Sequence, residues 1–196
     1  MIKKFLKAQH WQIFILVFAL PFFLQILITI SLFSSFNEGS APDPSFLNWF
    51  KLFPLIMLLY LGTTLGWFWS VGNGLQKYIP DGINLKIKKF RIFLLIPVVY
   101  LLLIFLLFGV ASYGFSSGNN AAGGTVGILL LFIIPLHLFS MFCMFYLLYF
   151  VSKTIKTVEL KRSVTFSDFV GEFFMIWFFP IGVWFIQPRI NKIISN

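Results

Sequence analysis

Long apolar stretches alternate with short polar segments along the whole chain. Five such stretches run at roughly 12–34, 50–71, 92–114, 126–151 and 169–187. A helix needs about 20 apolar residues to cross a hydrocarbon layer of roughly 30 Å. Four stretches exceed that length and the fifth just reaches it. The pattern predicts an all-α, polytopic membrane protein with about five transmembrane segments, which form one integral membrane domain over residues 1–196.

Each predicted span contains one proline, and these are Pro21, Pro54, Pro97, Pro135 and Pro180. A proline inside a helix removes one backbone hydrogen bond, so we expect every span to be kinked or locally unwound. Prolines are ordinary in membrane helices, but bent helices also line the cavities of transporters, and both interpretations stay open. The spacing of these prolines suggests an internal repeat. Spans two and three would form one helical hairpin, spans four and five a second parallel copy of it, and the first span would be an extra helix.

Composition excludes a soluble globule, because 59% of the 196 residues are hydrophobic and only 11% are charged. The net charge of +9 does not indicate nucleic-acid binding, since the basic residues lie in short connections between apolar spans. One cysteine, Cys143, and two histidines are too few for a disulfide framework or a dedicated Cys/His metal site. We expect no cofactor and no nucleic-acid partner.

The basic residues fall in alternate connections, which therefore share one side of the membrane. They lie before the first span and in the connections at 75–91 and 153–162. By the positive-inside rule, the side that these connections share is the cytoplasm. The connections at 35–49 and 116–124 carry no basic residue and suit the outer side. We expect a bacterial inner-membrane protein with a cytoplasmic N-terminus and a retained first span, because the first apolar run is longer than a cleaved signal.

The fifth stretch fits this scheme least well. Five complete crossings would leave the C-terminus outside, yet the tail carries Arg189 and Lys192. A full crossing over 169–187 is favoured. The alternative is a re-entrant segment that turns at the break Pro180-Ile181-Gly182 and returns.

Small residues recur every four positions in the second span, at Gly62, Gly66, Ser70 and Gly74. Such a strip lets another helix approach closely, so we expect it to be a helix-packing strip. His137 lies near the middle of the fourth span. A histidine there is either an interhelical hydrogen-bonding group or a proton carrier, and its expected partners are Gln25, Thr29, Thr63 and Thr64.

Asp168 and Glu172 lie four residues apart, so both carboxylates share one helix face at the start of the fifth span. One interpretation is that they begin the helix and are neutralised by Lys161 or Arg162. The other is that Glu172, the deeper residue, holds a cation or proton in a cavity. A catalytic acid pair lacks a companion nucleophile, metal cluster or phosphate loop, so no enzyme is expected.

Three segments resemble a family of small, uncharacterised bacterial inner-membrane proteins. They are Lys7-Ala8-Gln9-His10-Trp11-Gln12, the run Gly66-Trp67-Phe68-Trp69-Ser70-Val71-Gly72 with Gly74-Leu75-Gln76-Lys77, and the run from Phe178 to Asn191. The resemblance implies a shared architecture but no activity, so it assigns no catalytic or binding residue. It suggests that these segments anchor the fold or meet a cytoplasmic partner.

The sequence therefore favours a non-enzymatic accessory or structural component of a membrane assembly. Its expected partners are the lipid bilayer, anionic lipid headgroups at the basic loops and another membrane protein. The first alternative is a small transporter or channel in which Glu172 and His137 handle a cation, proton or small solute. A membrane-embedded enzyme is the second alternative, and it would need His137 and the carboxylates within hydrogen-bonding reach.

Overall fold

The computed structural model describes residues 2–36, 52–116 and 121–195, and this part of the chain is helical without any strand. Four helices there are long and apolar enough to cross a membrane: His10–Ser31, Pro54–Tyr78, Ile87–Val110 and Leu131–Leu160. They correspond to the first four predicted spans. Of the predicted outer connections, residues 37–49 and 117–120 lie outside the described residues, whereas 35–36, 116 and 121–124 belong to helices, so the second connection is shorter than predicted.

The chain divides into two compact units. Unit 1 comprises Met1–Ile83 with Ser152–Asn196, and unit 2 comprises Asn84–Val151. In unit 2, α7 (Ile87–Ser116) runs antiparallel to the first part of α8 (Ala121–Leu160). Two ring contacts fix this register, because Phe90 lies 4.5 Å from Phe150 and Phe93 lies 4.7 Å from Tyr146, centroid to centroid.

Unit 1 begins with two short helices joined by an elbow, α1 (Ile2–Lys7) and α2 (His10–Phe14). A π-helical turn, η1 (Ile15–Ala19), leads into α3 (Leu20–Phe36). Pro21, just after η1, has no N–H to donate to the carbonyl of Val17. Within the π-turn, the Leu20 N–H reaches back five residues to the Ile15 carbonyl.

The second candidate span is built from three pieces that follow one another: α5 (Phe53–Met57), the π-helical turn η3 (Leu58–Gly62) and α6 (Thr63–Gly74). The short 3₁₀ helix η4 (Leu75–Tyr78) ends it. Pro54 lies at the start of α5, where its missing N–H has no intrahelical partner to lose. Pro97 and Pro135 lie inside α7 and α8, which continue through them.

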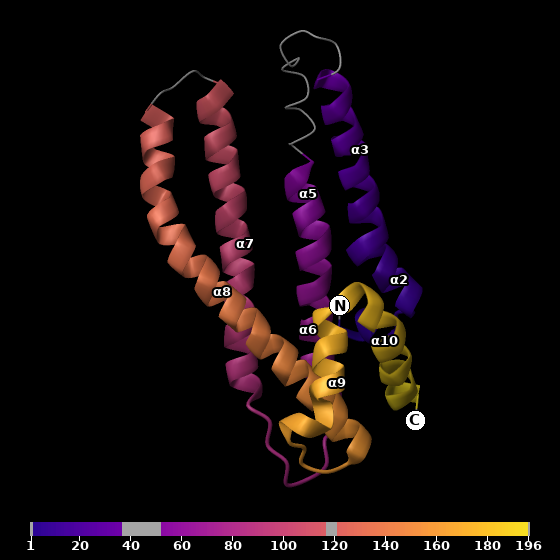
Figure 1. Ribbon diagram of the computed structural model, residues 1–196. Helices are drawn as coiled ribbons and strands as arrows, with labels where there is room; N and C mark the ends of the chain where they lie inside the picture. Colours follow the sequence, from indigo (N-terminus) through magenta and orange to yellow (C-terminus); the bar gives the residue numbers. More distant parts are fainter. Residues whose placement is uncertain (1, 37–51, 117–120, 196) are drawn as a thin grey trace. The chain divides into compact units, whose positions relative to one another are not determined.

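The fifth predicted span is not one helix. α9 (Phe166–Trp177) ends at Phe178, whose φ of −88° and ψ of 55° are not helical, and α10 (Phe179–Ser195) turns back beside α9 (Figure 1). The apolar stretch 169–187 is therefore divided between two helices. The turn lies at Phe178, two residues before the Pro180-Ile181-Gly182 break at which the re-entrant alternative placed it.

This broken segment also bears on the predicted repeat. In the two supposed copies, the second helix would be α7 in one and the segment 169–187 in the other. α7 is continuous through Pro97, whereas the other segment reverses its direction. The two copies therefore differ in their second helix.

The α9–α10 hairpin is closed by a backbone contact that only glycine permits. A Cβ placed on Gly182 would overlap the carbonyl group of Met175 and lie 3.1 Å from the Met175 Cα. Further from the turn, Arg189 of α10 contacts Glu172 of α9. Residue numbers therefore rise along α10 as those of their α9 partners fall. The two helices are therefore antiparallel and very close at the level of Gly182.

Candidate functional site: a buried polar junction

Gln187, on α10, is the centre of a polar junction between three helices of unit 1. Its side chain is completely buried, and its Oε1 accepts a hydrogen bond of 2.8 Å from the indole Nε1 of Trp67 on α6, which is also fully buried. Its Nε2 lies 3.0 Å from the Phe5 carbonyl oxygen and 2.9 Å from that of Ala8. One amide thus connects α1, α6 and α10.

The junction satisfies the end of α1. The last carbonyls of any helix lack intrahelical partners, and burying them unpaired is costly. Gln187 donates to two of these groups, and Asn191 Nδ2 donates to the Ala8 carbonyl at 3.1 Å. The side chains of α10 therefore act as a C-cap for α1, which contains no glycine or asparagine of its own to do this.

Aromatic rings enclose the polar atoms. The ring of Phe179 packs edge-on against Trp67, with centroids 4.9 Å apart. At the elbow, the His10 ring lies 4.5 Å from that of Trp184. Where α1 crosses α6, the Phe5 ring lies against Gly66, since an added Cβ would be 3.1 Å from its Cε2. The junction is thus flanked by rings from α1, α2, α6 and α10.

A charged network adjoins this junction, two residues further along α10. Glu172 on α9 accepts hydrogen bonds from Lys156 Nζ at 2.9 Å and from Arg189 Nη2 at 2.6 Å. Arg189 Nε also donates to Glu159 on α8 at 2.7 Å, and its Nη2 forms an ion pair with the same carboxylate. Two cations and two anions therefore neutralise one another between α8, α9 and α10.

Glu172 is an ionised structural partner in this arrangement. Its side chain is only 6% exposed, and burying a lone carboxylate is costly. The hydrogen bonds from Arg189 and Lys156 give this carboxylate two cationic partners. The hydrogen bond to Glu159 is the largest cause that raises the pKa of Arg189. Both groups keep their charges.

Asp168 begins α9 and has different partners from Glu172. Its carboxylate accepts a hydrogen bond from the backbone N–H of Thr165 at 2.8 Å, as part of a capping box, and pairs with Arg162 at 2.8 Å. The hydrogen bond from Arg162, helped by those from Thr165, lowers the pKa of Asp168 from 3.8 to about 2. The expected neutralisation by Lys161 or Arg162 is confirmed for Asp168, whose partner is Arg162, but Glu172 pairs with Lys156 and Arg189 instead.

His137 lies in unit 2 and takes no part in the junction. Its Nδ1 lies 2.8 Å from the hydroxyl of Tyr100, which joins α7 to α8. Of the partners expected for it, Thr29 donates to the Gln25 carbonyl and Thr64 to the Tyr60 carbonyl, each within its own helix. The interhelical partner of His137 is thus a tyrosine that the sequence analysis did not select.

The helix-packing strip is used at its centre. Gly66 lies against Phe5 of α1, and Ser70 is buried and donates to the Gly66 carbonyl at 2.7 Å. At Gly62, an added Cβ would meet only Leu58 of the same helical segment among the described residues. Gly74 ends α6. The close approach that the strip permits is made by the short helix α1.

The three segments 7–12, 66–77 and 178–191 meet in this junction. Ala8 and His10 come from the first segment, Gly66 and Trp67 from the second, and Gln187, Arg189 and Asn191 from the third. Sequence reasoning did not assign roles to Gln187, Lys156 or Glu159. Gln187 carried a usable signal, because an amide in an apolar segment must find partners.

Within the described part of the chain, no three His, Cys, Asp or Glu side chains lie together as metal ligands. Cys143 is a buried free thiol in unit 2. Comparison of the chain with protein families, with curated proteins and with solved structures finds no match.

Proposed function

We propose that this protein is a non-enzymatic accessory or structural component of a membrane assembly. The observation that carries the proposal is that Glu172 is held in ion pairs. This carboxylate would be the best candidate to bind a transported cation or proton, but it faces Lys156 and Arg189 instead of a cavity. A transporter needs its intramembrane acid free to exchange a cation or proton, whereas a fold anchor needs it neutralised.

The proposed topology has four full crossings followed by a re-entrant hairpin, α9–α10. With 12 residues, α9 is about 18 Å long at 1.5 Å per residue, which reaches roughly half-way through a hydrocarbon layer. The tip of the hairpin is strongly apolar, with Phe178 63% and Ile181 67% exposed. Such a tip suits insertion into lipid from one side.

The backbone of the turn supports insertion, because unsatisfied N–H and C=O groups are costly in lipid. The N–H of Phe178 donates to the Phe174 carbonyl at 3.0 Å. The Phe178 carbonyl accepts from the N–H groups of Ile181 at 3.0 Å and Gly182 at 2.8 Å. The reversal therefore leaves both backbone groups of Phe178 hydrogen-bonded.

A re-entrant hairpin also removes the conflict in the charge pattern. Four crossings return the chain to its starting side, so the basic tail with Arg189 and Lys192 shares that side with the N-terminal lysines and the loops 75–91 and 153–162. By the positive-inside rule this side is the cytoplasm of a bacterial inner membrane. The basic loops there attract anionic lipid headgroups.

Purification of the tagged protein from its native membrane in mild detergent, with mass spectrometry of what co-purifies, tests the proposed role. We expect a partner membrane protein in fixed stoichiometry with this chain. Variants that open the junction, such as Gln187→Leu, should lose the partner, while a surface variant such as Lys192→Gln should retain it. A homogeneous preparation of this chain alone, active in liposome flux, would contradict the proposal.

A small transporter or channel is the second candidate, and the two π-helical turns favour it. η1 and η3 lie in contact in the first two candidate spans, η1 next to Pro21 and η3 after Pro54. π-turns and proline kinks often mark functional sites in helices. This candidate requires ion or solute flux in liposomes that falls in Glu172→Gln and His137→Ala.

A further inference from the structure

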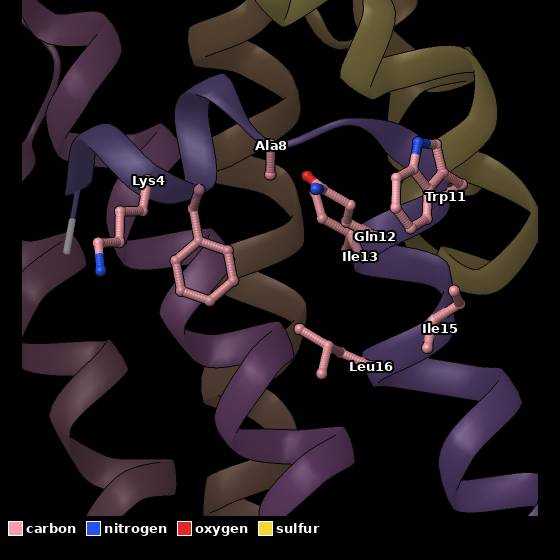
Figure 2. A pocket seen from close by; sticks show the side chains of 8 residues that line it. Lys4, Ala8, Trp11, Gln12, Ile13, Ile15 and Leu16 are labelled. Carbon is pink, nitrogen blue, oxygen red and sulfur yellow. The ribbon is translucent and has the colours of Figure 1, made fainter.

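A groove lies on the elbow between α1 and α2, beside the junction. It has a volume of about 590 Å³ and is lined mostly by apolar side chains (Figure 2). Figure 2 shows Lys4 on one side of it and Trp11 and Ile15 on the other, with Ala8 and Leu16 between. All of these residues belong to unit 1.

The lining combines two chemistries. Phe5, Ile15 and Leu16 offer apolar surface, and the last two are 43% and 40% exposed. Lys4 supplies a cation, and no acidic side chain is paired with it among the described residues. A ligand that satisfies both must be an amphiphile with an anionic end.

The position of the groove points to the source of that amphiphile. The apolar helix His10–Ser31 begins inside the groove, so the groove lies where this candidate span meets the membrane surface. Trp11, 44% exposed at the same level, is the residue type that prefers the lipid headgroup region. Phospholipid is the amphiphile that is present there at high concentration.

We propose that this groove binds one glycerophospholipid with an anionic headgroup. The Lys4 ammonium contacts the phosphate, and an acyl chain follows Phe5, Ile15 and Leu16. The bound lipid would hold α1 against the membrane surface and so support the junction on its other side. This inference rests on the proposed insertion of α2, η1 and α3 in the membrane.

Native mass spectrometry of the whole protein released from detergent, with phosphatidylglycerol or phosphatidylcholine of identical acyl chains, tests the site. We expect wild type to retain one phosphatidylglycerol in preference to phosphatidylcholine. Lys4→Gln should weaken phosphatidylglycerol binding about fivefold, the equivalent of the roughly 1 kcal/mol that a basic residue contributes at an anionic surface. Lys7→Gln, on the same helix but outside the groove, should bind as wild type.

Filling the groove tests the apolar part separately. Ala8→Trp places an indole where the acyl chain would lie, and its expected result is loss of both lipids, while the Ala8 carbonyl stays available to Gln187 and Asn191. Glycerol phosphate without acyl chains should not bind. Equal lipid retention by all variants, binding of glycerol phosphate alone, or a second copy of the chain occupying the groove would each overturn the site.

Insertion is measured in parallel by resistance of the protein to carbonate extraction from vesicles. A protein that is inserted but retains no preferred lipid contradicts only the lipid site. A protein that is extracted contradicts the proposed membrane topology as well. Lys4→Gln is the informative variant if Ala8→Trp does not fold, because Lys4 is exposed and makes no hydrogen bond within the junction.

Discussion

At the scale of single residues, Gln187 explains more of the fold than any charged group. A buried primary amide has two donors and an acceptor, and this one uses them on a tryptophan and on the end of a helix. Removing it would leave the buried Trp67 indole N–H without its partner and would take one hydrogen bond each from the Phe5 and Ala8 carbonyls. The side chain is therefore a positioning residue for α1 and α6.

Replacement Gln187→Leu should lower the free energy of unfolding by about 1–3 kcal/mol, the cost of leaving the buried Trp67 indole N–H unsatisfied. The measurement is unfolding in detergent, with hydrogen exchange of residues 2–12 to detect release of α1. Gln76→Leu is the matched control, since the Gln76 amide bonds only to the Gly72 carbonyl of its own segment. Equal losses in both variants would contradict a special role for Gln187.

Glu172→Gln should also destabilise the protein, because it leaves Lys156 without its anion. The loss should stay below the roughly 3–5 kcal/mol seen when a fully buried pair is broken, since Lys156 and Arg189 are 22% and 32% exposed. Adding Lys156→Met removes the unpaired cation and should recover part of the stability. A Glu172→Gln protein as stable as wild type but deficient in flux would instead support transport.

The lowered pKa of Asp168 makes us expect that the stability of the protein depends on pH in the acid range. Its pKa is lowered from 3.8 to about 2 in the folded protein, so its contribution is present above about pH 4 and is lost as pH falls through about 2. Thermal unfolding of wild type and Asp168→Asn between pH 2 and 6 measures it. The difference between the two should shrink below about pH 4, and a difference independent of pH would contradict the ion pair.

At the scale of elements, the α9–α10 hairpin is the least conventional part of the fold. Its two helices approach at Gly182 more closely than a Cβ allows. The hairpin is joined to α8 by the charged network and to α1 and α6 by the Gln187 junction. The close approach at Gly182, the charged network and the Gln187 junction therefore all hold the chain reversal at Phe178 in place.

Gly182→Ala should force α10 away from Met175 and destabilise the hairpin by about 1–3 kcal/mol, the usual cost of overpacking. Gly171→Ala is the matched control on the same hairpin, because nothing lies within 4 Å of an added Cβ there. That control should be neutral or slightly stabilising, as expected for glycine to alanine in a helix. Melting curves in detergent compare the two, and a stable Gly182→Ala protein would contradict the close approach.

At the scale of the whole molecule, hydropathy predicted the four long helices because apolar length alone decides whether a helix can span lipid. The same length criterion also selected 169–187, which does not form one continuous helix. There a reversal at Phe178 divides an apolar run into two short helices, and apolar content does not encode chain direction. The basic tail residues Arg189 and Lys192 were the sequence feature that favoured the alternative with a turn.

The junction was only partly predictable for a different reason. Its hydrogen bonds join Gln187 to residues 120–182 positions away, and no local periodicity reports contacts at such distances. The capping of α9 by Asp168 was predictable because it is local. Glu172 was singled out as the deeper of the two acids, but its partners are Lys156 and Arg189, from two other helices, and not the expected Lys161 or Arg162.

The central claim is that the chain crosses four times and that its end returns to the side where it began. Cysteine labelling tests it most directly, in a Cys143→Ser background, with Lys7→Cys, Ser34→Cys and Ser195→Cys made singly. A membrane-impermeant maleimide is applied to vesicles of each orientation. We predict that Lys7→Cys and Ser195→Cys react from one side and Ser34→Cys from the other. Reaction of Ser195→Cys from the same side as Ser34→Cys would show a fifth crossing and contradict the re-entrant hairpin.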